Sequence, residues 1–193
     1  MHVLLSSVAA IAIAAVAFTQ TPSPRETAKA KVGGESVSVE YGRPSLNGRS
    51  FSELTSKLPE DRMWRAGSEQ VTTLTVSGDV YVGDSKVPAG EYSLYVYCPA
   101  DGEYALAVNE VVGQPLGEVW AEAPDGLKNE LWPHFSYTED IGDSEVARVP
   151  LAETKTSSTV DMFTIALEEN GDGAVMKLAW GEAAWSVPVK AAK

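Results

Sequence analysis

The sequence has 193 residues, of which 44% are hydrophobic and 22% are charged, so it can fold as one domain with a sizeable core. Its formal net charge of −12 at pH 7 argues against nucleic acid and anionic membrane surfaces as partners, because both require clustered lysine and arginine. A single cysteine, Cys98, excludes an intrachain disulfide bond.

The first predicted element is a signal peptide, residues 1–17. Residues 3–17 are apolar except for two serines, which is shorter than the roughly 20 residues that a membrane-spanning helix needs. Ala15-Val16-Ala17 has the small residues of a cleavage site, so we predict removal after Ala17, export to the periplasm or the extracellular space, and no membrane attachment afterwards. Because His2 replaces the usual Lys or Arg, an uncleaved N-terminal anchor is the alternative interpretation.

A flexible linker is predicted over residues 18–35, since "FTQTPSPRETAKAK" is polar, contains prolines and lacks periodicity. Residues 36–190 are predicted to form a single all-β domain, because short alternating runs are separated by turn residues. The predicted fold class is an antiparallel β-sandwich or jelly-roll-like domain of about 8–10 short strands with one or two short helical turns.

Strands and turns are predicted from this alternation in chain order. The expected strands before the middle of the chain cover Val37 to Tyr41, Val71 to Val76, Val80 to Val82, Tyr92 to Cys98 and Glu103 to Asn109. The last two should form a hairpin. The C-terminal segments resemble a meander with turns at Asn170 to Gly173 and Gly181 to Ala183, which would pair Trp180 and Trp185 across a terminal hairpin.

One helix is predicted, because Ser50 to Glu53 matches a capping box. It should begin at Phe51 and end by Lys57 or Leu58, before Pro59. Residues 111–140 form the longest irregular region, with at most one helical turn before Pro133. Trp120 and Trp132 in this loop are free to face a ligand or to anchor the loop.

No catalytic motif is present, and we predict no catalytic residue, no metal ligand and no cofactor. His134 is the only histidine after the predicted cleavage site, which excludes a site with several histidine ligands. The "ENGDG" segment resembles part of a calcium loop, but Ala179 occupies the position where a bidentate Glu is required. Cys98 is expected to be a buried, unreactive residue at the end of a strand.

Two irregular segments, "VEYGRPSLNGRSF" and "WRAGSEQ", concentrate the arginines of an arginine-poor chain. Their arginines suit bidentate binding of a carboxylate, phosphate or sugar hydroxyl, with aromatic side chains as walls. The candidate ligand-binding residues are Tyr41, Arg43, Arg49, Trp64, Arg65 and Glu69. The alternative is structural: the arginines would pair with Glu40, Glu53, Glu60, Asp61 or Glu69 and attach the irregular segments to the sheet.

Together with "VPAGEYSLYVY", "EYALAVNE" and "FTIALEENGDGAVMKLAWGEAAWSVPV", these two segments resemble the DUF2911 family of exported bacterial proteins of unknown function. The resemblance runs in order from about Ser36 to Val189. It departs from the family at Ser68-Glu69, where relatives commonly have Asn-Glu. The resemblance implies no activity, cofactor or substrate, but it gives the arginine cluster more weight as a site.

Two functions follow from these residues. The first is a non-catalytic exported β-domain that binds a small molecule, glycan or protein through the Arg- and Trp-lined region. The second is a secreted hydrolase of glycans or esters that would use Glu69 with another carboxylate such as Glu40 or Asp61. A pair of carboxylates in one open cleft would favour the hydrolase.

Overall fold

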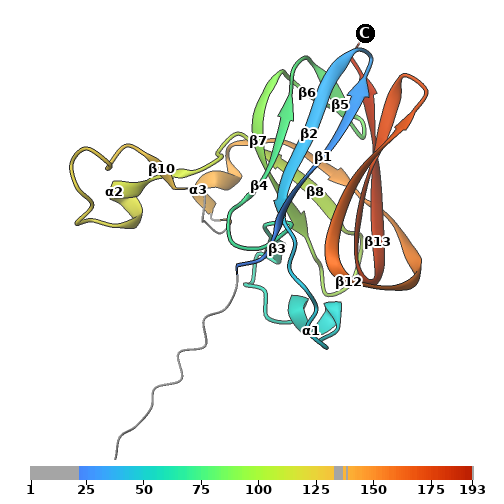
Figure 1. The fold of residues 1–193 in the computed structure, drawn as a ribbon, viewed down its shortest axis with the longest axis horizontal. Helices are drawn as coiled ribbons and strands as arrows, with labels where there is room; N and C mark the ends of the chain where they lie inside the picture. The colour runs from blue at the N-terminus through green and yellow to red at the C-terminus, as the bar shows by residue number, and fades with distance from the viewer. Residues whose placement is uncertain (1–21, 133–136, 138, 193) are drawn as a thin grey trace, which may run out of the picture.

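The structure is a computed structural model that describes residues 22–132, 137 and 139–192 (Figure 1). The predicted signal peptide and His134 lie outside the described residues. Within them, the chain is an antiparallel β-sandwich with short helices, which confirms the predicted fold class. None of the helices in the described part is long and apolar enough to cross a membrane.

The secondary structure consists mainly of strands. In chain order the elements are β1 (Arg25–Val32), β2 (Glu35–Gly42), α1 (Phe51–Thr55), β3 (Met63–Trp64), β4 (Thr72–Val76), β5 (Val80–Val82), β6 (Ser85–Val87), β7 (Gly90–Tyr97), β8 (Ala105–Asn109), β9 (Gln114–Pro115), α2 (Leu116–Val119), β10 (Leu131–Trp132), α3 (Glu139–Gly142), β11 (Glu145–Pro150), β12 (Ala152–Asn170) and β13 (Gly173–Ala191). The predicted strand Val80 to Val82 and the predicted hairpin, which is β7 and β8, are confirmed.

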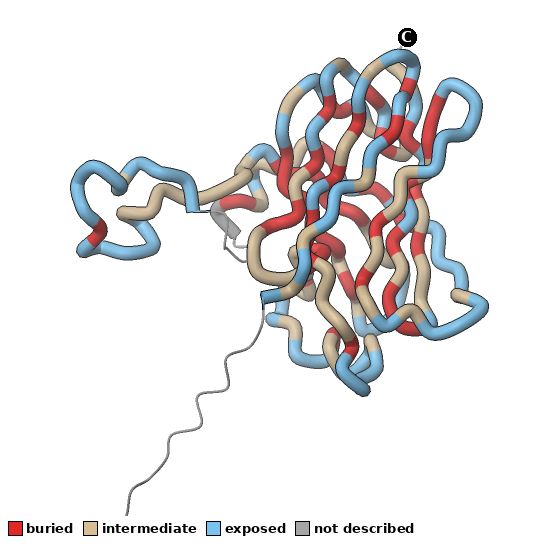
Figure 2. Tube along the Cα trace, in the orientation of Figure 1, coloured by how far each residue is buried: buried red, intermediate tan, exposed pale blue. Residues whose placement is uncertain are grey.

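Two sheets form the sandwich. The larger has the strand order β1-β2-β4-β7-β8-β11, with β3 pairing with β7, and the smaller has the order β12-β13-β5-β6. Alternating apolar residues of β2, β4, β7 and β8 face those of β12 and β13, which places the buried residues between the sheets (Figure 2). The core includes Val37, Val39, Tyr41, Leu74, Leu94, Leu106, Phe163, Met176, Leu178, Trp180 and Trp185.

The structure corrects the predicted linker. Arg25–Val32 forms β1, which pairs with β2 along its whole length from Arg25↔Gly42 to Val32↔Glu35. Its inward residues include the small Ala28 and Ala30 between charged ones, so its alternation was too weak to indicate a strand. Charged side chains are typical of an edge strand, because they oppose pairing with another chain.

The predicted C-terminal meander is also wrong in one part. The turn at Asn170 to Gly173 is present, but β13 continues through Gly181 to Ala191 instead of turning there. Gly181 has a φ of +68° and pairs with Val160 between two register shifts. The extra residues at these shifts lie in β12, so β12 bulges opposite Gly181 while β13 continues as a strand. Trp180 and Trp185 therefore lie on one strand, and both are buried in the core.

The capping box is confirmed at α1. Ser50 Oγ accepts a hydrogen bond from the Glu53 backbone N–H at 3.2 Å, and Glu53 Oε2 accepts one from the Ser50 backbone N–H at 2.6 Å. The Ser50 backbone N–H, and then the Ser50 hydroxyl, donate to the Glu53 carboxylate and hold the pKa of Glu53 below its usual value. The helix ends at Thr55, well before Pro59.

The long irregular region contains a projecting arm, which we define as residues 114–132. It consists of β9, α2 and β10 and extends away from the sandwich on the left of Figure 1. The antiparallel pair β9–β10 forms its stem, and α2 is its single helical turn.

Candidate functional site

The two irregular segments of the sequence meet at one end of the sandwich, and we call residues 42–50 and 64–70 the corner. A Cβ added to Gly42 would lie 2.4 Å from the carbonyl oxygen of Ser68. A Cβ added to Gly67 would lie 2.9 Å from Thr72 Oγ1 and 3.0 Å from the carbonyl oxygen of Gly42. Only glycine permits backbones to approach so closely, so Gly42 and Gly67 serve the same contact between the two segments.

The segment 43–50 is attached to β12 of the opposite sheet. The Phe163 N–H donates to the carbonyl of Pro44 at 2.9 Å, and the Leu46 N–H donates to the carbonyl of Asp161 at 2.9 Å. Ser45 Oγ also donates to the Asp161 carboxylate. This loop therefore joins the edges of the two sheets and has a defined position.

Arg43 binds main-chain and side-chain oxygens of both sheets. Its Nε donates to the carbonyl of Phe163 at 3.2 Å and its Nη2 to Thr164 Oγ1 at 3.1 Å. Its Nη1 forms an ion pair with Glu26 Oε2 on β1 at 2.6 Å. The guanidinium thus holds the corner together, although its carboxylate partner is none of those considered in the sequence.

Tyr41 and Trp64 lie inward among aromatic side chains. Tyr41 has no exposed surface, and its hydroxyl donates to the carbonyl of Ile165 at 3.0 Å. Burial raises the pKa of Tyr41 above its ordinary value. Trp64 is half-buried and stacks on Trp180 with ring centroids 5.3 Å apart, while its Nε1 donates to the carbonyl of Gly67 at 3.1 Å.

Arg65 and Glu69 are linked through the backbone of their own loop. Arg65 Nη1 donates to the carbonyl oxygen of Glu69 at 2.8 Å. The Glu69 side chain points instead toward the start of the described chain, where its Oε1 accepts the Ser23 N–H at 2.6 Å. Arg65 therefore positions the Glu69 backbone and leaves the carboxylate for other contacts.

Backbone strain is concentrated in the same part of the molecule. Among the described residues other than glycine, positive φ occurs at Asn47 (51°), Arg62 (59°), Ala66 (50°) and Glu69 (61°). Such conformations are unfavourable for residues with a Cβ and tend to cluster where binding groups must be held in place. Asn47 and Glu69 belong to the two segments that form the corner.

Arg49 and Glu69, two of the predicted site residues, line the same open hollow. This hollow has a volume of about 630 Å³ and is lined by Pro22, Ser23, Pro44, Ser45, Asn47, Arg49 and Glu69. Arg49 also lines a neighbouring hollow of about 500 Å³ beside Phe51, Glu53 and Glu182. The Arg49 side chain is exposed and donates to the carbonyls of Leu46 at 2.8 Å and Ser45 at 3.4 Å.

Arg49 differs from Arg43 in forming no ion pair with a carboxylate among the described side chains. None of the ion pairs among the described side chains includes Arg49, Arg65 or Glu69. Arg65 and Trp64 line a separate, smaller hollow of about 180 Å³ with Asp61 and Tyr137. The candidate residues therefore divide into an inward group, Tyr41 and Arg43, and a group of four that line hollows, Arg49, Trp64, Arg65 and Glu69.

The carboxylates considered for a hydrolase are distributed over different hollows. Glu40 forms an ion pair with Arg25 at 2.9 Å and lines a hollow on the outer face of the large sheet. Asp61 Oδ1 accepts the Met63 N–H at 2.9 Å beside Arg65. In the Arg49–Glu69 hollow, Glu69 is the one carboxylate among the described lining residues.

Ser23, Ser45 and Asn47 also line this hollow, and none of them was predicted to be a site residue. Ser45 and Asn47 lie within the motif between Arg43 and Arg49, so their position was visible in the sequence. Ser23 belongs to the segment that was assigned to a linker. Its place beside Glu69 depends on β1 pairing with β2, which brings the N-terminal segment to the corner.

Two further expectations concern the chemistry of the chain. Cys98 has no exposed surface, and burial raises the pKa of its thiol to about 12, in agreement with a buried, unreactive residue. Among the side chains of residues 22–132, 137 and 141–192, no group of three or more potential metal ligands is found.

Comparison with known proteins finds one similarity. No curated protein and no solved structure matches the chain. The sequence profile of the family described as "Protein of unknown function (DUF2911)" matches residues 23–189. The matched range includes β1, both segments of the corner and the arm. The chain therefore belongs to the DUF2911 family.

Proposed function

We propose that this protein is a non-catalytic exported binding protein whose small ligand occupies the hollow between Arg49 and Glu69. The observation that carries the proposal is the state of Arg49. Its guanidinium is exposed, donates only to main-chain oxygens of its own loop among the described groups, and lines two adjoining hollows. An arginine in this state retains N–H groups for a bidentate ligand.

The lining of the hollow suggests the chemistry of the ligand. Arg49 supplies one positive charge and Glu69 one negative charge, with the hydroxyls of Ser23 and Ser45 and the amide of Asn47 between the backbone walls. A ligand with an anionic group at one end and hydroxyl or ammonium donors at the other would satisfy both ends. Sugar acids and amino acids have this pattern, and the volume lies within the range of about 300–1,000 Å³ that is typical of ligand sites.

The rigidity of the corner supports a binding role. The loop that carries Arg49 is hydrogen-bonded to β12, and the Glu69 backbone is fixed by Arg65. Binding groups that are already positioned lose little entropy when a ligand binds. The strained backbone at Asn47 and Glu69 is then a cost that the corner bears in order to orient them.

Thermal unfolding with defined probes tests the proposal. The purified protein would be melted with inorganic phosphate, acetate, glucuronate, glucose and glycine, each over a range of concentrations. A probe at 100 times its Kd stabilises the folded state by about 2.7 kcal/mol, which gives a measurable rise in Tm. We expect glucuronate or glycine to give the largest rise, because each carries an anionic group together with donors.

The matched variants are Arg49→Ala and Lys177→Ala, each of which removes one positive charge. Lys177 forms its ion pair with Glu168 on β12–β13 and lines neither hollow. The shift should be lost in Arg49→Ala and retained in Lys177→Ala. A shift that survives Arg49→Ala would move the site elsewhere, and the absence of any shift would contradict the proposal.

Export is part of the same proposal and has its own test. Expression of the whole sequence in a bacterium with a periplasm should yield a chain that begins at Phe18, as measured by intact mass. The protein should be recovered in the periplasmic fraction or the medium. A chain that retains Met1 and sediments with membranes would favour the N-terminal anchor instead.

A further inference from the structure

We propose that the arm docks a second protein, and that this partner presents lysine or arginine side chains around an apolar surface. The proposal concerns residues 114–132 and is independent of the ligand proposed for the corner. It follows from the exposure, the internal structure, the attachment and the charge of the arm.

The arm carries most of the exposed large apolar side chains. Of the six such residues in the described part of the chain, five belong to the arm: Val119, Trp120, Leu127, Leu131 and Trp132, with exposed fractions from 40% to 58%. Single exposed apolar residues are normal on a protein surface, but a group of this kind marks an interaction site. Tryptophan is also among the residues most enriched at the energetic centres of protein interfaces.

This exposure is not the result of an unfolded segment. Leu116 N–H donates to the carbonyl of Glu130 at 2.8 Å, and Gly117 N–H donates to that of Lys128 at 2.9 Å. Trp120 N–H donates to the carbonyl of Leu116 at 2.7 Å, and Ala123 is buried. The arm therefore satisfies its own main chain and presents its apolar side chains from a folded hairpin.

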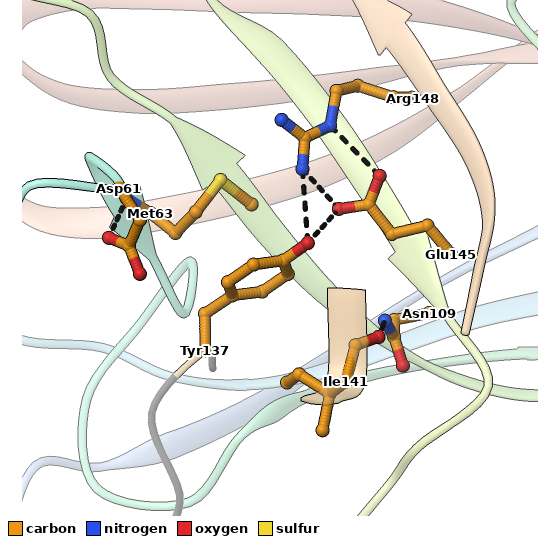
Figure 3. Close-up of polar contacts among 7 residues, drawn as sticks. All are labelled: Asp61, Met63, Asn109, Tyr137, Ile141, Glu145 and Arg148. Carbon is orange, nitrogen blue, oxygen red and sulfur yellow. Dashed lines mark hydrogen bonds and ion pairs between the residues drawn. The ribbon is translucent and has the colours of Figure 1, made fainter. Parts of the chain in front are cut away.

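The base of the arm is attached to the large sheet by buried polar contacts (Figure 3). The fully buried Asn109 accepts the Val111 N–H at Oδ1, 2.8 Å away, and donates from Nδ2 to the carbonyl of Ile141. Ser93 Oγ donates to the carbonyl of Val111 at 2.8 Å. One side chain thus ties the segments that precede and follow the arm to the same point of the sheet.

A second attachment lies beside the first. Tyr137 packs edge-on against Tyr95 with ring centroids 5.1 Å apart. Its hydroxyl donates to Glu145 Oε1 at 2.5 Å and accepts from Arg148 Nη2 at 3.2 Å (Figure 3). A fixed base lowers the entropy that a projecting element loses when it binds a partner.

Charge indicates what kind of partner fits. The arm contains the acidic residues Glu118, Glu122, Asp125 and Glu130 and the single basic residue Lys128, which gives a formal charge of −4 + 1 = −3. Lys128 is already paired with Asp125 at 2.6 Å. A surface that combines exposed apolar and acidic side chains is complementary to one that combines apolar and basic side chains.

The same charges argue against two other occupants. A second copy of this chain has a formal charge of −12, so arm-to-body association would bring acidic surfaces together. Bacterial membranes contain anionic lipids that repel an acidic hairpin. A basic protein surface is therefore the occupant that the arm favours.

The test uses three synthetic helical peptides in which two residue types occupy the same positions. The types are leucine with lysine, serine with lysine, and leucine with glutamate. Trp120 and Trp132 are the exposed tryptophans of the described chain, so their fluorescence should shift to shorter wavelength when the arm is covered. We expect binding and a blue shift with the leucine–lysine peptide alone. Raising the salt concentration should weaken it, since the charges lie at the surface.

Matched variants separate the arm from the rest of the acidic surface. Trp120→Ser with Leu131→Ser should weaken binding by roughly tenfold or more, while Tyr81→Ser, at the exposed apolar residue outside the arm, should have no effect. Because the double variant changes the fluorescent signal, its affinity is measured by calorimetry. Glu118→Lys with Glu130→Lys should also weaken binding, whereas Asp101→Lys with Glu103→Lys, at exposed positions outside the arm, should not.

Each other outcome overturns the proposal. Equal binding by the serine–lysine peptide, or binding that survives both arm variants, would mean nonspecific attraction to the acidic surface. Arm-dependent dimers in sedimentation would assign the arm to a second copy. A blue shift with phosphatidylcholine vesicles and not with the leucine–lysine peptide would assign it to a membrane, and no shift with any probe would leave it without a docking role.

Discussion

The corner and the arm differ in the kind of side chain that each leaves exposed, which is polar in the corner and apolar in the arm. In the corner, polar side chains join backbone segments from two sheets, and the remaining open surface is a hollow lined by Arg49 and Glu69. In the arm, the backbone is satisfied within one hairpin, and the open surface is a set of apolar side chains. The corner is therefore suited to a small polar ligand, and the arm to a large apolar surface.

The contrast shows that an unusual sequence motif does not by itself indicate a binding site, whereas an exposed group without a structural contact can indicate one. The glycines and Arg43 of the corner are explained by contacts that the fold requires, so their presence alone identifies no site. Arg49 lies in the same motif but has no carboxylate partner among the described side chains. A function is better sought in exposed groups that the contacts of the fold do not explain, which are Arg49, Glu69 and the exposed apolar side chains of the arm.

Glycine substitutions in the two regions should give the largest contrast. Gly42→Ala would place a Cβ 2.4 Å from the Ser68 carbonyl oxygen, and backbone must move to relieve that contact. We expect a loss of about 3 kcal/mol in the free energy of unfolding in urea. Gly126→Ala in the arm meets no atom within 4 Å and should change the same quantity by less than about 0.5 kcal/mol. Equal effects would mean that the two segments of the corner are not in contact.

Arg43→Ala should lower the free energy of unfolding more than Arg49→Ala does, although this difference is smaller than that between the two glycine variants. Arg43→Ala removes hydrogen bonds to Phe163 and Thr164, for which we expect a loss of about 1–2 kcal/mol in urea unfolding. Its half-exposed ion pair with Glu26 should add little to that loss. Arg49→Ala should cost less than about 1 kcal/mol, because its hydrogen bonds lie within one exposed loop. A larger loss for Arg49→Ala would make Arg49 a structural residue and weaken the proposed function.

The sequence predicted correctly those structural features that depend on neighbouring residues, and it failed for those that depend on contacts between distant segments. The α1 capping box, the β7–β8 hairpin and the turn at Asn170–Gly173 depend on neighbouring residues, and all three are confirmed. β1 was not predicted because its inward face consists largely of alanines, and because its strand conformation depends on pairing with β2. Gly181, which lies in β13 opposite an irregular part of β12, was interpreted as a turn, since its glycine is also typical of turns.

The partner of Arg43 shows the same limit within the candidate site. The carboxylates considered for the arginines lie within or between the two irregular segments, but Glu26 lies before them and is brought there by the β1–β2 register, in which it lies opposite Tyr41. The missing strand therefore concealed the correct partner, and it also concealed Ser23. Likewise, Tyr41 is buried because its face of β2 packs against the second sheet, and Arg49 is exposed because it lies in the loop that follows. Which face is buried depends on the packing of the whole core, so neighbouring residues do not determine it.

The hydrogen bond of Tyr137 near the base of the arm should make the free energy of unfolding depend on pH in alkaline solution. Burial, and then the hydrogen bond to Glu145, raise the pKa of Tyr137 to about 12, whereas an unfolded tyrosine has a pKa of about 10. The folded state holds this proton more tightly, so its contribution to stability is complete below about pH 10 and is lost as the pH rises toward 12. Other tyrosines with raised pKa values contribute to the same fall.

Tyr137→Phe isolates the contribution of this one hydroxyl. At pH 8 the variant should be less stable than the parent by about 1 kcal/mol, because the bond to Glu145 is lost. The difference should shrink between pH 10 and 12, since the variant has no proton to lose at this position. Urea unfolding at several pH values measures both effects. A difference that is constant with pH would show that the hydroxyl is not bound to Glu145 in solution.

The smallest effect should come from the apolar residues at the arm itself. Trp120→Ser with Leu131→Ser removes two large side chains, which in a core would cost several kcal/mol. Because both are about half exposed and β9, α2 and β10 pack on one another, urea unfolding should change by less than about 1 kcal/mol. The inward-facing Trp185→Ser supplies the contrast, since Trp185 is 1% exposed and its loss should be at least about 3 kcal/mol. If the arm variant were as destabilising as the core variant, the exposed tryptophan would be a structural residue. A near-neutral result would instead leave binding as the remaining physical reason for two large apolar side chains to stand in water.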